Sequence, residues 1–183
     1  NSNKIVTRKG SHKGDLIFAT GPFGYTSVGL DILLNNKKKK NNLIKKSLES
    51  VTNPKPRLSY GLKNKKYFTS SMDSSDGLST TLNEMSKQSR KKFIINKIPL
   101  NIDLEIYLKK QKMNLHSAVF HGGEEYEFIF TIPAKHKKII IKNAKILKTP
   151  IIEIGYVELG NGVYLEKNNK KNILKDLGWK HFK

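Results

Sequence analysis

The chain has 183 residues, with 35 lysines and arginines against 15 aspartates and glutamates, so its formal net charge is +20. Hydrophobic residues make up 37% of it, which excludes a wholly disordered chain, and the absence of cysteine excludes disulfides, a thiolate nucleophile and cysteine-ligated metal sites. No apolar run approaches the roughly 20 residues of a membrane span, and the first residues lack both a signal peptide and an initiator Met, so we expect a piece of a soluble, cytoplasmic protein.

The first third of the chain contains one predicted strand and two predicted helices. Residues 15–20 are apolar and β-rich and end at a Gly-Pro pair, which indicates a strand followed by a turn. Residues 27–34 have apolar positions in helical order, and a second helix is expected around residues 43–51. The sequence Asn-Pro-Lys-Pro at 53–56 then favours a loop.

A third helix is predicted to begin at Leu78, after a polar segment in the middle of the chain. Leu78, Leu82 and Met85 follow one another at i, i+4 and i+7, which is the apolar stripe of a helix that packs on a core. Residues 93–98 predict a strand that ends at a proline, and residues 102–110 predict a helix.

The last third of the chain contains the strongest strand prediction, residues 126–132, which two glycines precede and a proline follows. A helix is expected over residues 134–143, and strands over residues 151–157 and 162–166, with a Gly-Asn-Gly turn between these two strands. The alternation of strands and helices predicts a layered α/β/α domain of the α+β class, whose topology does not follow from the pattern.

Two aspartates flank a pair of serines just before the helix predicted at Leu78: Asp73 and Asp76. Helix N-termini favour anions, and two carboxylates there could also hold Mg²⁺, which prefers oxygen ligands and often bridges to phosphates. The alternative is structural, with Ser74, Ser75 or Asp76 as the N-cap of the helix, worth about 1 kcal/mol.

The sequence His-Gly-Gly-Glu-Glu-Tyr-Glu at residues 121–127 leads into the strongest predicted strand. Adjacent glycines let a ligand approach the backbone closely. Three glutamates within four residues could accept hydrogen bonds from an amine or pair with a cationic ligand. The alternative is a glycine turn with solvated acids, and these residues alone do not decide between the two.

Two further segments contain candidate ligand contacts. The only tryptophan, Trp179, lies beside His181 and Phe182 near the C-terminus, where it either packs on the core or stacks on a flat ligand. Arg8 precedes the first strand in a basic segment, where it either contacts phosphate or belongs to a solvated loop. No pair of histidines has the helical spacing of a metal site, and no nucleophile elbow or Walker loop occurs.

The lysines are spread over the whole chain and mixed with Asn and Ile, and only Lys37–Lys40 forms a block. No helix-turn-helix, zinc-finger or RNA-recognition motif accompanies them. We therefore expect no specific nucleic acid partner, with a basic nucleic-acid-binding module as the alternative. A positive field would also attract a phosphorylated small molecule.

Five segments follow one another in a recognisable order: Gly-Asp-Leu-Ile-Phe-Ala-Thr-Gly at 14–21, Met-Asp-Ser-Ser-Asp-Gly-Leu at 72–78, Gly-Gly-Glu-Glu-Tyr-Glu at 122–127, Ile-Gly-Tyr-Val at 154–157 and Gly-Trp-Lys-His-Phe at 178–182. This order resembles the C-terminal part of thiamine-monophosphate kinase, in the superfamily of aminoimidazole ribonucleotide synthetase. The resemblance covers nearly the whole chain, and the Gly-Trp-x-His-Phe ending separates this kinase from its superfamily relatives. Glu125 is a departure, since the family usually has Asp there.

The resemblance implies an ATP-dependent phosphotransferase that converts thiamine phosphate to thiamine diphosphate. By motif position, the implied site residues are Asp73 and Asp76 for Mg²⁺, Arg8 and Ser75 for ATP, and Glu124 and Trp179 for the substrate. No residue is implied as a covalent or acid–base catalyst, because metal ions and positioned donors stabilise most of the charge in phosphoryl transfer.

The resemblance also implies the domain organisation. Residues 1–183 would form a single C-terminal domain that binds substrate and nucleotide, with a mixed sheet flanked by helices. The family's N-terminal domain, which supplies further Mg²⁺ ligands and the dimer contact, would be absent, so we expect little activity from this chain alone and a homodimer at full length. An alternative interpretation is a different enzyme of the superfamily, acting on a ribonucleotide, selenide or a maturation protein's carbamoyl group.

Overall fold

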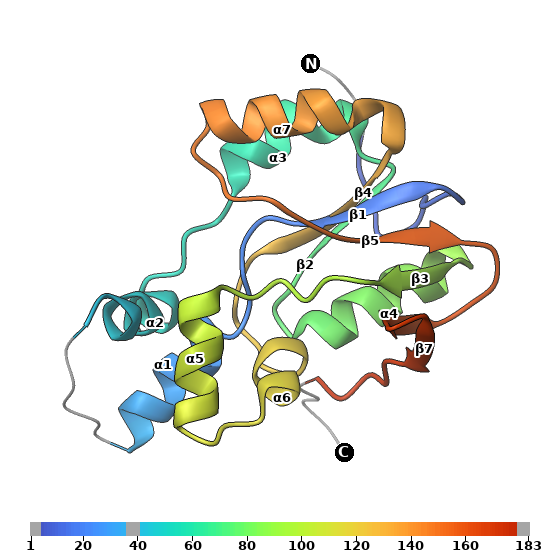
Figure 1. Cartoon of the computed structure of the whole chain (residues 1–183). Helices are drawn as coiled ribbons and strands as arrows, with labels where there is room; N and C mark the ends of the chain where they lie inside the picture. Colours follow the sequence, from blue (N-terminus) through green and yellow to red (C-terminus); the bar gives the residue numbers. More distant parts are fainter. Residues whose placement is uncertain (1–4, 36–40, 179–183) are drawn as a thin grey trace.

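The computed structural model describes residues 5–35 and 41–178, which form a sheet enclosed between helices (Figure 1). The strands are β1 (Asp15–Ala19), β2 (Ser70–Asp73), β3 (Lys92–Ile95), β4 (Phe128–Pro133), β5 (Ile152–Glu158), β6 (Val163–Lys167) and β7 (Lys170–Ile173). The helices are α1 (Tyr25–Leu34), α2 (Asn42–Thr52), α3 (Leu58–Asn64), α4 (Leu78–Ser89), α5 (Ile102–Lys110), α6 (Leu115–Phe120) and α7 (Lys137–Ile146), with short 3-10 turns at η1 (Lys65–Tyr67) and η2 (Ala134–His136). In these described ranges, no helix is long and apolar enough to cross a membrane.

The seven strands form one mixed sheet in the order β2-β4-β1-β5-β3-β6-β7. Every neighbouring pair is antiparallel except β3 and β6, which are parallel. The apolar strands β1 and β4 lie side by side, whereas β2, which precedes Ser74 and Asp76, forms an edge. The predicted mixed sheet flanked by helices is therefore confirmed.

Alternation of side chains along β1 and β4 gives the sheet two apolar faces. Ile17 and Ile129 lie in one cluster with the predicted stripe of α4, including Leu82, which is fully buried. On the other face Phe18 and Phe130 stack with ring centroids 5.5 Å apart, beneath α3 and α7. Figure 1 shows the resulting layers, with α3 and α7 above the sheet and α4 below it.

Helices α1, α2, α5 and α6 form a separate apolar cluster at one end of the sheet (Figure 1). Helices α1 and α2 cross closely at Gly29, where a Cβ atom would lie 2.1 Å from the Ser47 carbonyl oxygen, so a glycine is required there. The Ser27 hydroxyl donates to the Ala118 carbonyl at 2.9 Å and ties α1 to α6. The Thr26 hydroxyl donates to the Gly123 carbonyl at 2.9 Å, so the start of α1 is also held against the segment that follows α6.

Most of the predicted elements are confirmed within a few residues, and α5 has the predicted bounds 102–110. The strand predicted from residue 126 begins only at Phe128, because Tyr126 has a left-handed φ of 52°. The predicted turn at 160–162 connects β5 to β6, but these two strands are not neighbours in the sheet, because β3 lies between them. The sequence did not predict α3, β2, α6 or β7.

Candidate functional site

The two acidic motifs lie side by side, although about 50 residues separate them in the chain. The Glu124 N–H donates to the Ser75 carbonyl at 2.6 Å, and the Tyr126 N–H donates to the Ser74 carbonyl at 3.3 Å. In the other direction, the Ser74 N–H donates to the Glu127 carbonyl at 2.9 Å. Three backbone hydrogen bonds therefore join the turn after β2 to the segment before β4.

Glycines allow this close approach. A Cβ atom on Gly123 would lie 2.8 Å from the Ser75 carbonyl oxygen, and Gly77 has a φ of 108° and lies against Gly122. Helix α4 has Gly77 at its N-cap and no side-chain capping hydrogen bond, so the structural alternative with Ser74, Ser75 or Asp76 as the cap is wrong. The hydroxyls and carboxylate of the turn are not used to begin the helix.

The three glutamates of the second motif have different environments. Glu124 and Tyr126 have left-handed φ values of 60° and 52°, which are unusual for residues other than glycine. As a result, Glu124 and Tyr126 are exposed, whereas Glu125 and Glu127 are buried at 9% and 8% exposure. The alternative of three solvated acids therefore holds only for Glu124. Backbone strain of this kind persists where surrounding contacts fix it.

Glu125 anchors the beginning of α1. Its carboxyl oxygen Oε1 accepts hydrogen bonds from the Gly24 N–H at 2.5 Å and from the Thr26 N–H at 3.3 Å. Burial raises the pKa of Glu125 from 4.5 to about 7, although the hydrogen bonds from Gly24 and Thr26 oppose this shift. The segment that presents Glu124 is thus fixed to a helix through its neighbour.

The raised pKa of Glu125 predicts a pH-dependent stability. Between about pH 4.5 and 7 the unfolded chain has released this proton and the folded chain retains it, so the free energy of unfolding falls as pH rises. At one pKa unit per about 1.4 kcal/mol, we expect a decline on the order of 3 kcal/mol that Glu125→Gln lacks, since its amide oxygen still accepts both N–H groups. Urea denaturation at a series of pH values measures this, and parallel profiles for the two proteins would contradict it.

Glu127 is held by Arg57, a residue that the sequence analysis missed. Arg57 donates from Nε and Nη2 to the two carboxylate oxygens at 2.9 and 2.6 Å, and the Thr20 hydroxyl donates to Oε2 at 2.6 Å. The Glu127 hydrogen bond raises the pKa of Arg57. Arg57 directly precedes α3, so the pair fixes this helix to the motif. Nothing in the sequence pairs two residues that lie 70 positions apart.

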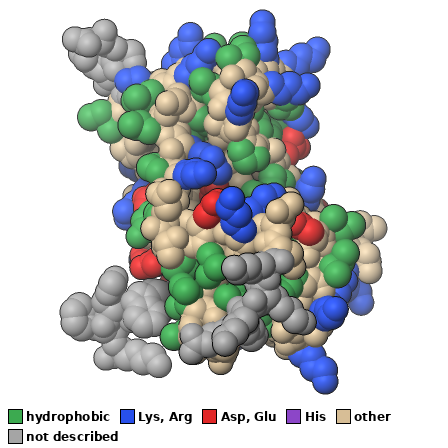
Figure 2. Space-filling view, turned by 90° about the vertical axis from the view of Figure 1, so that its left-hand side faces the viewer, with side chains coloured by type: hydrophobic (Ala, Val, Ile, Leu, Met, Phe, Trp, Pro, Cys, Tyr) green, Lys and Arg blue, Asp and Glu red, His purple; other side chains and the backbone are tan. Residues whose placement is uncertain are grey.

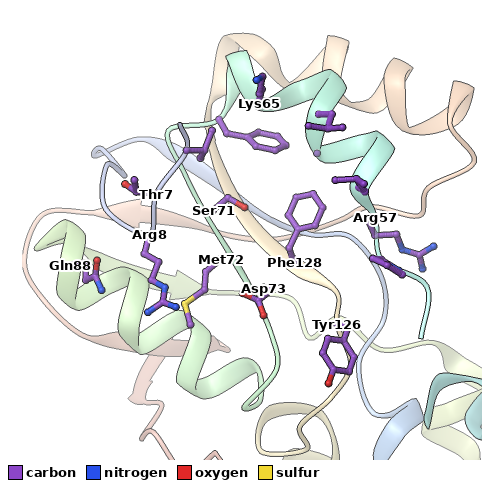
Figure 3. A pocket seen from close by; sticks show the side chains of 16 residues that line it. Thr7, Arg8, Arg57, Lys65, Ser71, Met72, Asp73, Gln88, Tyr126 and Phe128 are labelled. Carbon is purple, nitrogen blue, oxygen red and sulfur yellow. The ribbon is translucent and has the colours of Figure 1, made fainter. Parts of the chain in front are cut away.

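Two clefts flank Tyr126. The first, which we call the Arg8 cleft, has a volume of about 770 Å³ and contains Arg8, Asp73 and Tyr126, with Phe128 on an apolar wall. Figure 3 shows Arg8, Asp73 and Tyr126 around its lower part, below Phe128. The structure therefore places Arg8 in a cleft, although its side chain is exposed.

The second cleft, which we call the Glu124 cleft, has a volume of about 560 Å³ and contains Ser75, Asp76, Glu124 and Tyr126. Tyr126 is common to both clefts, and the sequence analysis had assigned it only to a strand. The structure brings together five of the six predicted site residues in these two clefts. The sixth, Trp179, lies outside the described residues.

The segment that leads to Trp179 lies beside the same turn. Gly178, the last residue described, packs so closely that a Cβ atom would lie 2.2 Å from the Asp76 carbonyl oxygen. The Thr80 hydroxyl donates to the Asp176 carboxylate at 2.6 Å, which holds this segment on α4. The described end of the chain is therefore adjacent to the Glu124 cleft.

The donor set fits Mg²⁺ only in part. Asp73 is exposed at the end of β2, and Asp76 is half-buried in the following turn. Within residues 5–35 and 41–178, no three His, Asp or Glu side chains are grouped to hold a metal. Mg²⁺ commonly takes one or two protein carboxylates and completes its shell with phosphates and water. Asp73 and Asp76 suit that mode of binding and not a closed protein cage.

The chain is similar to known proteins over its whole length. It is 64% identical over 182 residues to the thiamine-monophosphate kinase of Nitrosopumilus maritimus, covering 100% of this chain and 58% of that protein. It is 32% identical over 183 residues to the thiamine-monophosphate kinase of Aquifex aeolicus, covering 99% of this chain and 56% of that protein. The chain thus spans just over half the length of these relatives. No protein-family model matches it.

Solved structures agree with these relationships. The structure of AaThiL complexed with AMPPCP and TMP has a TM-score of 0.81 and 32% identity, covering 97% of this chain and 54% of that one. A HypE–HypF complex has a TM-score of 0.74 at 15% identity, covering 93% of this chain and 55% of that one, and shows a shared fold only.

Proposed function

From its homology to the thiamine-monophosphate kinases, we propose that this protein transfers the γ-phosphoryl group of ATP to thiamine phosphate. The observation that carries the proposal is the backbone pairing of the two motifs, which sets the Arg8 cleft and the Glu124 cleft on either side of Tyr126. A phosphoryl transfer between two bound phosphates needs two adjoining sites of this kind.

The residues divide between the two reactants. Arg8, in the Arg8 cleft, and Ser75, on the adjoining lining of the Glu124 cleft, contact the phosphates of ATP, for which a guanidinium and a hydroxyl supply hydrogen-bond donors. Glu124 pairs with the cationic thiazolium ring of thiamine phosphate, and Trp179 stacks on the thiamine. AMPPCP, which accompanies TMP in the AaThiL complex, is an analogue of ATP.

Asp73 and Asp76 are the proposed Mg²⁺ ligands. When bound, Mg²⁺ neutralises the negative charge that phosphate oxygens share during transfer. The chain itself orients these two carboxylates, because Asp73 ends β2 and Asp76 lies in the turn before α4. The hydrogen bonds from the Glu124 and Tyr126 N–H groups fix this turn. No acid–base catalyst is required, because the attacking phosphate oxygen is already ionised at neutral pH.

The remaining parts of the site lie outside this chain in the proposal. Residues 1–183 form the C-terminal, substrate- and nucleotide-binding domain of a two-domain kinase. A preceding domain completes the Mg²⁺ and ATP sites and forms the homodimer. The surplus of positive charge favours the approach of both phosphorylated reactants.

A direct assay tests the proposal. The native protein that contains this chain should form thiamine diphosphate from ATP and thiamine phosphate when Mg²⁺ is present, as followed by chromatography. Unphosphorylated thiamine, aminoimidazole ribonucleotide precursors and a chelator serve as controls, and none should yield thiamine diphosphate. ATP consumption driven by another acceptor, without thiamine diphosphate, would favour a different enzyme of the superfamily.

In this chain Trp179 is the only tryptophan, so its emission should also change saturably with thiamine phosphate and be insensitive to a short DNA duplex.

A further inference from the structure

The layer that contains α3 and α7 has an unusual charge composition. Residues 58–67 and 134–150 include no aspartate or glutamate. They contain nine lysines, which are Lys63, Lys65, Lys66, Lys135, Lys137, Lys138, Lys142, Lys145 and Lys148. The lysines look evenly spread along the sequence, but the fold brings two separate segments together, because α3 packs against α7. Figure 2 shows Lys and Arg side chains gathered over the upper part of the molecule, where this layer lies.

Helix α7 directs a row of positive charges outward. It packs on the sheet through Ile140 and Ala144, which are buried. Lys138, Lys142 and Lys145 are exposed at i, i+4 and i+7, and we call them the α7 stripe. None of the three makes an ion pair with a residue of the described ranges, whereas the adjacent Lys137 pairs with Glu153 at 2.6 Å.

We propose that the α3–α7 face binds the sugar–phosphate backbone of nucleic acid independently of base sequence. Seven residues of helix span about 10 Å, and each strand of a duplex presents a negative charge about every 3.4 Å of its axis. The α7 stripe therefore matches about three consecutive phosphates. Lys63 and Lys148, also exposed, extend the positive surface at its margins.

The residues of this face favour a nucleic acid over a lipid surface and over base recognition. Peripheral membrane helices insert several large apolar side chains. Ile146 is the only exposed large hydrophobic residue of α7, and the exposed Leu58 and Leu62 of α3 line the Arg8 cleft. Reading of bases needs free aromatic rings or amides, yet Tyr67 is packed against His136 with ring centroids 5.0 Å apart. None of the α7 stripe lines the Arg8 cleft or the Glu124 cleft, so this activity is separate from the proposed kinase site.

The experiment measures the salt dependence of binding. The native protein is titrated into a fluorescent duplex of about 20 base pairs, and into single-stranded RNA, between about 50 and 200 mM salt. The variant Lys138→Gln/Lys142→Gln/Lys145→Gln keeps good helix-forming residues on α7. We expect the slope of log K against log salt to become shallower by about 3, and the affinity near 150 mM salt to fall about 10²-fold.

A second triple variant with the same loss of charge distinguishes a local binding site from a diffuse effect of the protein's positive charge. Lys97→Gln/Lys110→Gln/Lys112→Gln removes three exposed lysines that lie in α5 and nearby loops, away from the α7 stripe. It changes the net charge by the same amount. This variant should retain nearly the full slope. Equal losses in the two variants would overturn the proposal, because the charge would then act diffusely. Binding to phosphatidylserine vesicles without binding to duplex or RNA would overturn it in favour of a lipid partner, and kinase activity should be unchanged in both variants.

Discussion

Asp73→Asn and Asp76→Asn should each lower the kcat of thiamine diphosphate formation by at least about 10²-fold. Asparagine keeps the size and one oxygen of the side chain but removes its negative charge, and Mg²⁺ binds such neutral oxygens weakly. The loss falls on the transition state, where charge spread over the phosphate oxygens depends most on the metal. Steady-state rates over a range of Mg²⁺ concentrations measure both the fall in kcat and the expected rise in the Mg²⁺ requirement.

The fold should tolerate both substitutions. Asp73 is exposed, and neither carboxylate makes a side-chain hydrogen bond or ion pair with the described residues, so the free energy of unfolding should change by less than about 0.5 kcal/mol. Glu105→Gln is the matched control, because it removes a partly exposed carboxylate of α5 whose partner is Lys109, remote from both clefts. Near-normal turnover in either aspartate variant would show that its carboxylate is not a Mg²⁺ ligand.

Local patterns were sufficient to predict the elements that carry long apolar signals. The i, i+4, i+7 stripe of α4 is buried as expected, and the apolar run of β4 lies next to β1 in the sheet. Short, polar elements escaped prediction because tertiary contacts create them. β2 is Ser-Ser-Met-Asp, which has no strand periodicity, and it is a strand because β4 supplies its hydrogen bonds.

The candidate site was predicted as a set of residues but not as an arrangement. The resemblance identified Asp73, Ser75, Asp76 and Glu124 by motif, and the structure adds that backbone hydrogen bonds join the two motifs. The separation of Glu124 from its buried neighbours depends on two left-handed residues, and no composition rule predicts an aromatic side chain in that conformation. Long-range pairs such as Arg57 with Glu127 leave no local signal either.

Arg57→Ala should lower the free energy of unfolding by about 3 kcal/mol. The guanidinium makes a bidentate contact with Glu127, and the two side chains are 23% and 11% exposed. Removing Arg57 leaves a carboxylate in a largely buried position, and the Thr20 hydroxyl is then the only side-chain donor to it among the described residues. An unpaired charge in such a position costs far more than the intact pair contributes. Chemical denaturation measures the loss, and a change below about 0.5 kcal/mol would show that water replaces the guanidinium freely.

A double-mutant cycle separates loss of the pair from loss of packing. Arg57→Ala/Glu127→Gln leaves no unpaired charge, so it should be less destabilised than the sum of the two single variants. Arg57→Lys keeps the charge but cannot reproduce the planar two-point contact, and it should recover only part of the stability.

The Glu127 carbonyl also accepts the Ser74 N–H, so a displaced Glu127 loosens the join between the two motifs. Thiamine phosphate should then bind more weakly to Arg57→Ala even at temperatures where the variant is folded. Arg57 lines the Arg8 cleft, but its side-chain hydrogen bonds go to Glu127 and not to Asp73 or Glu124.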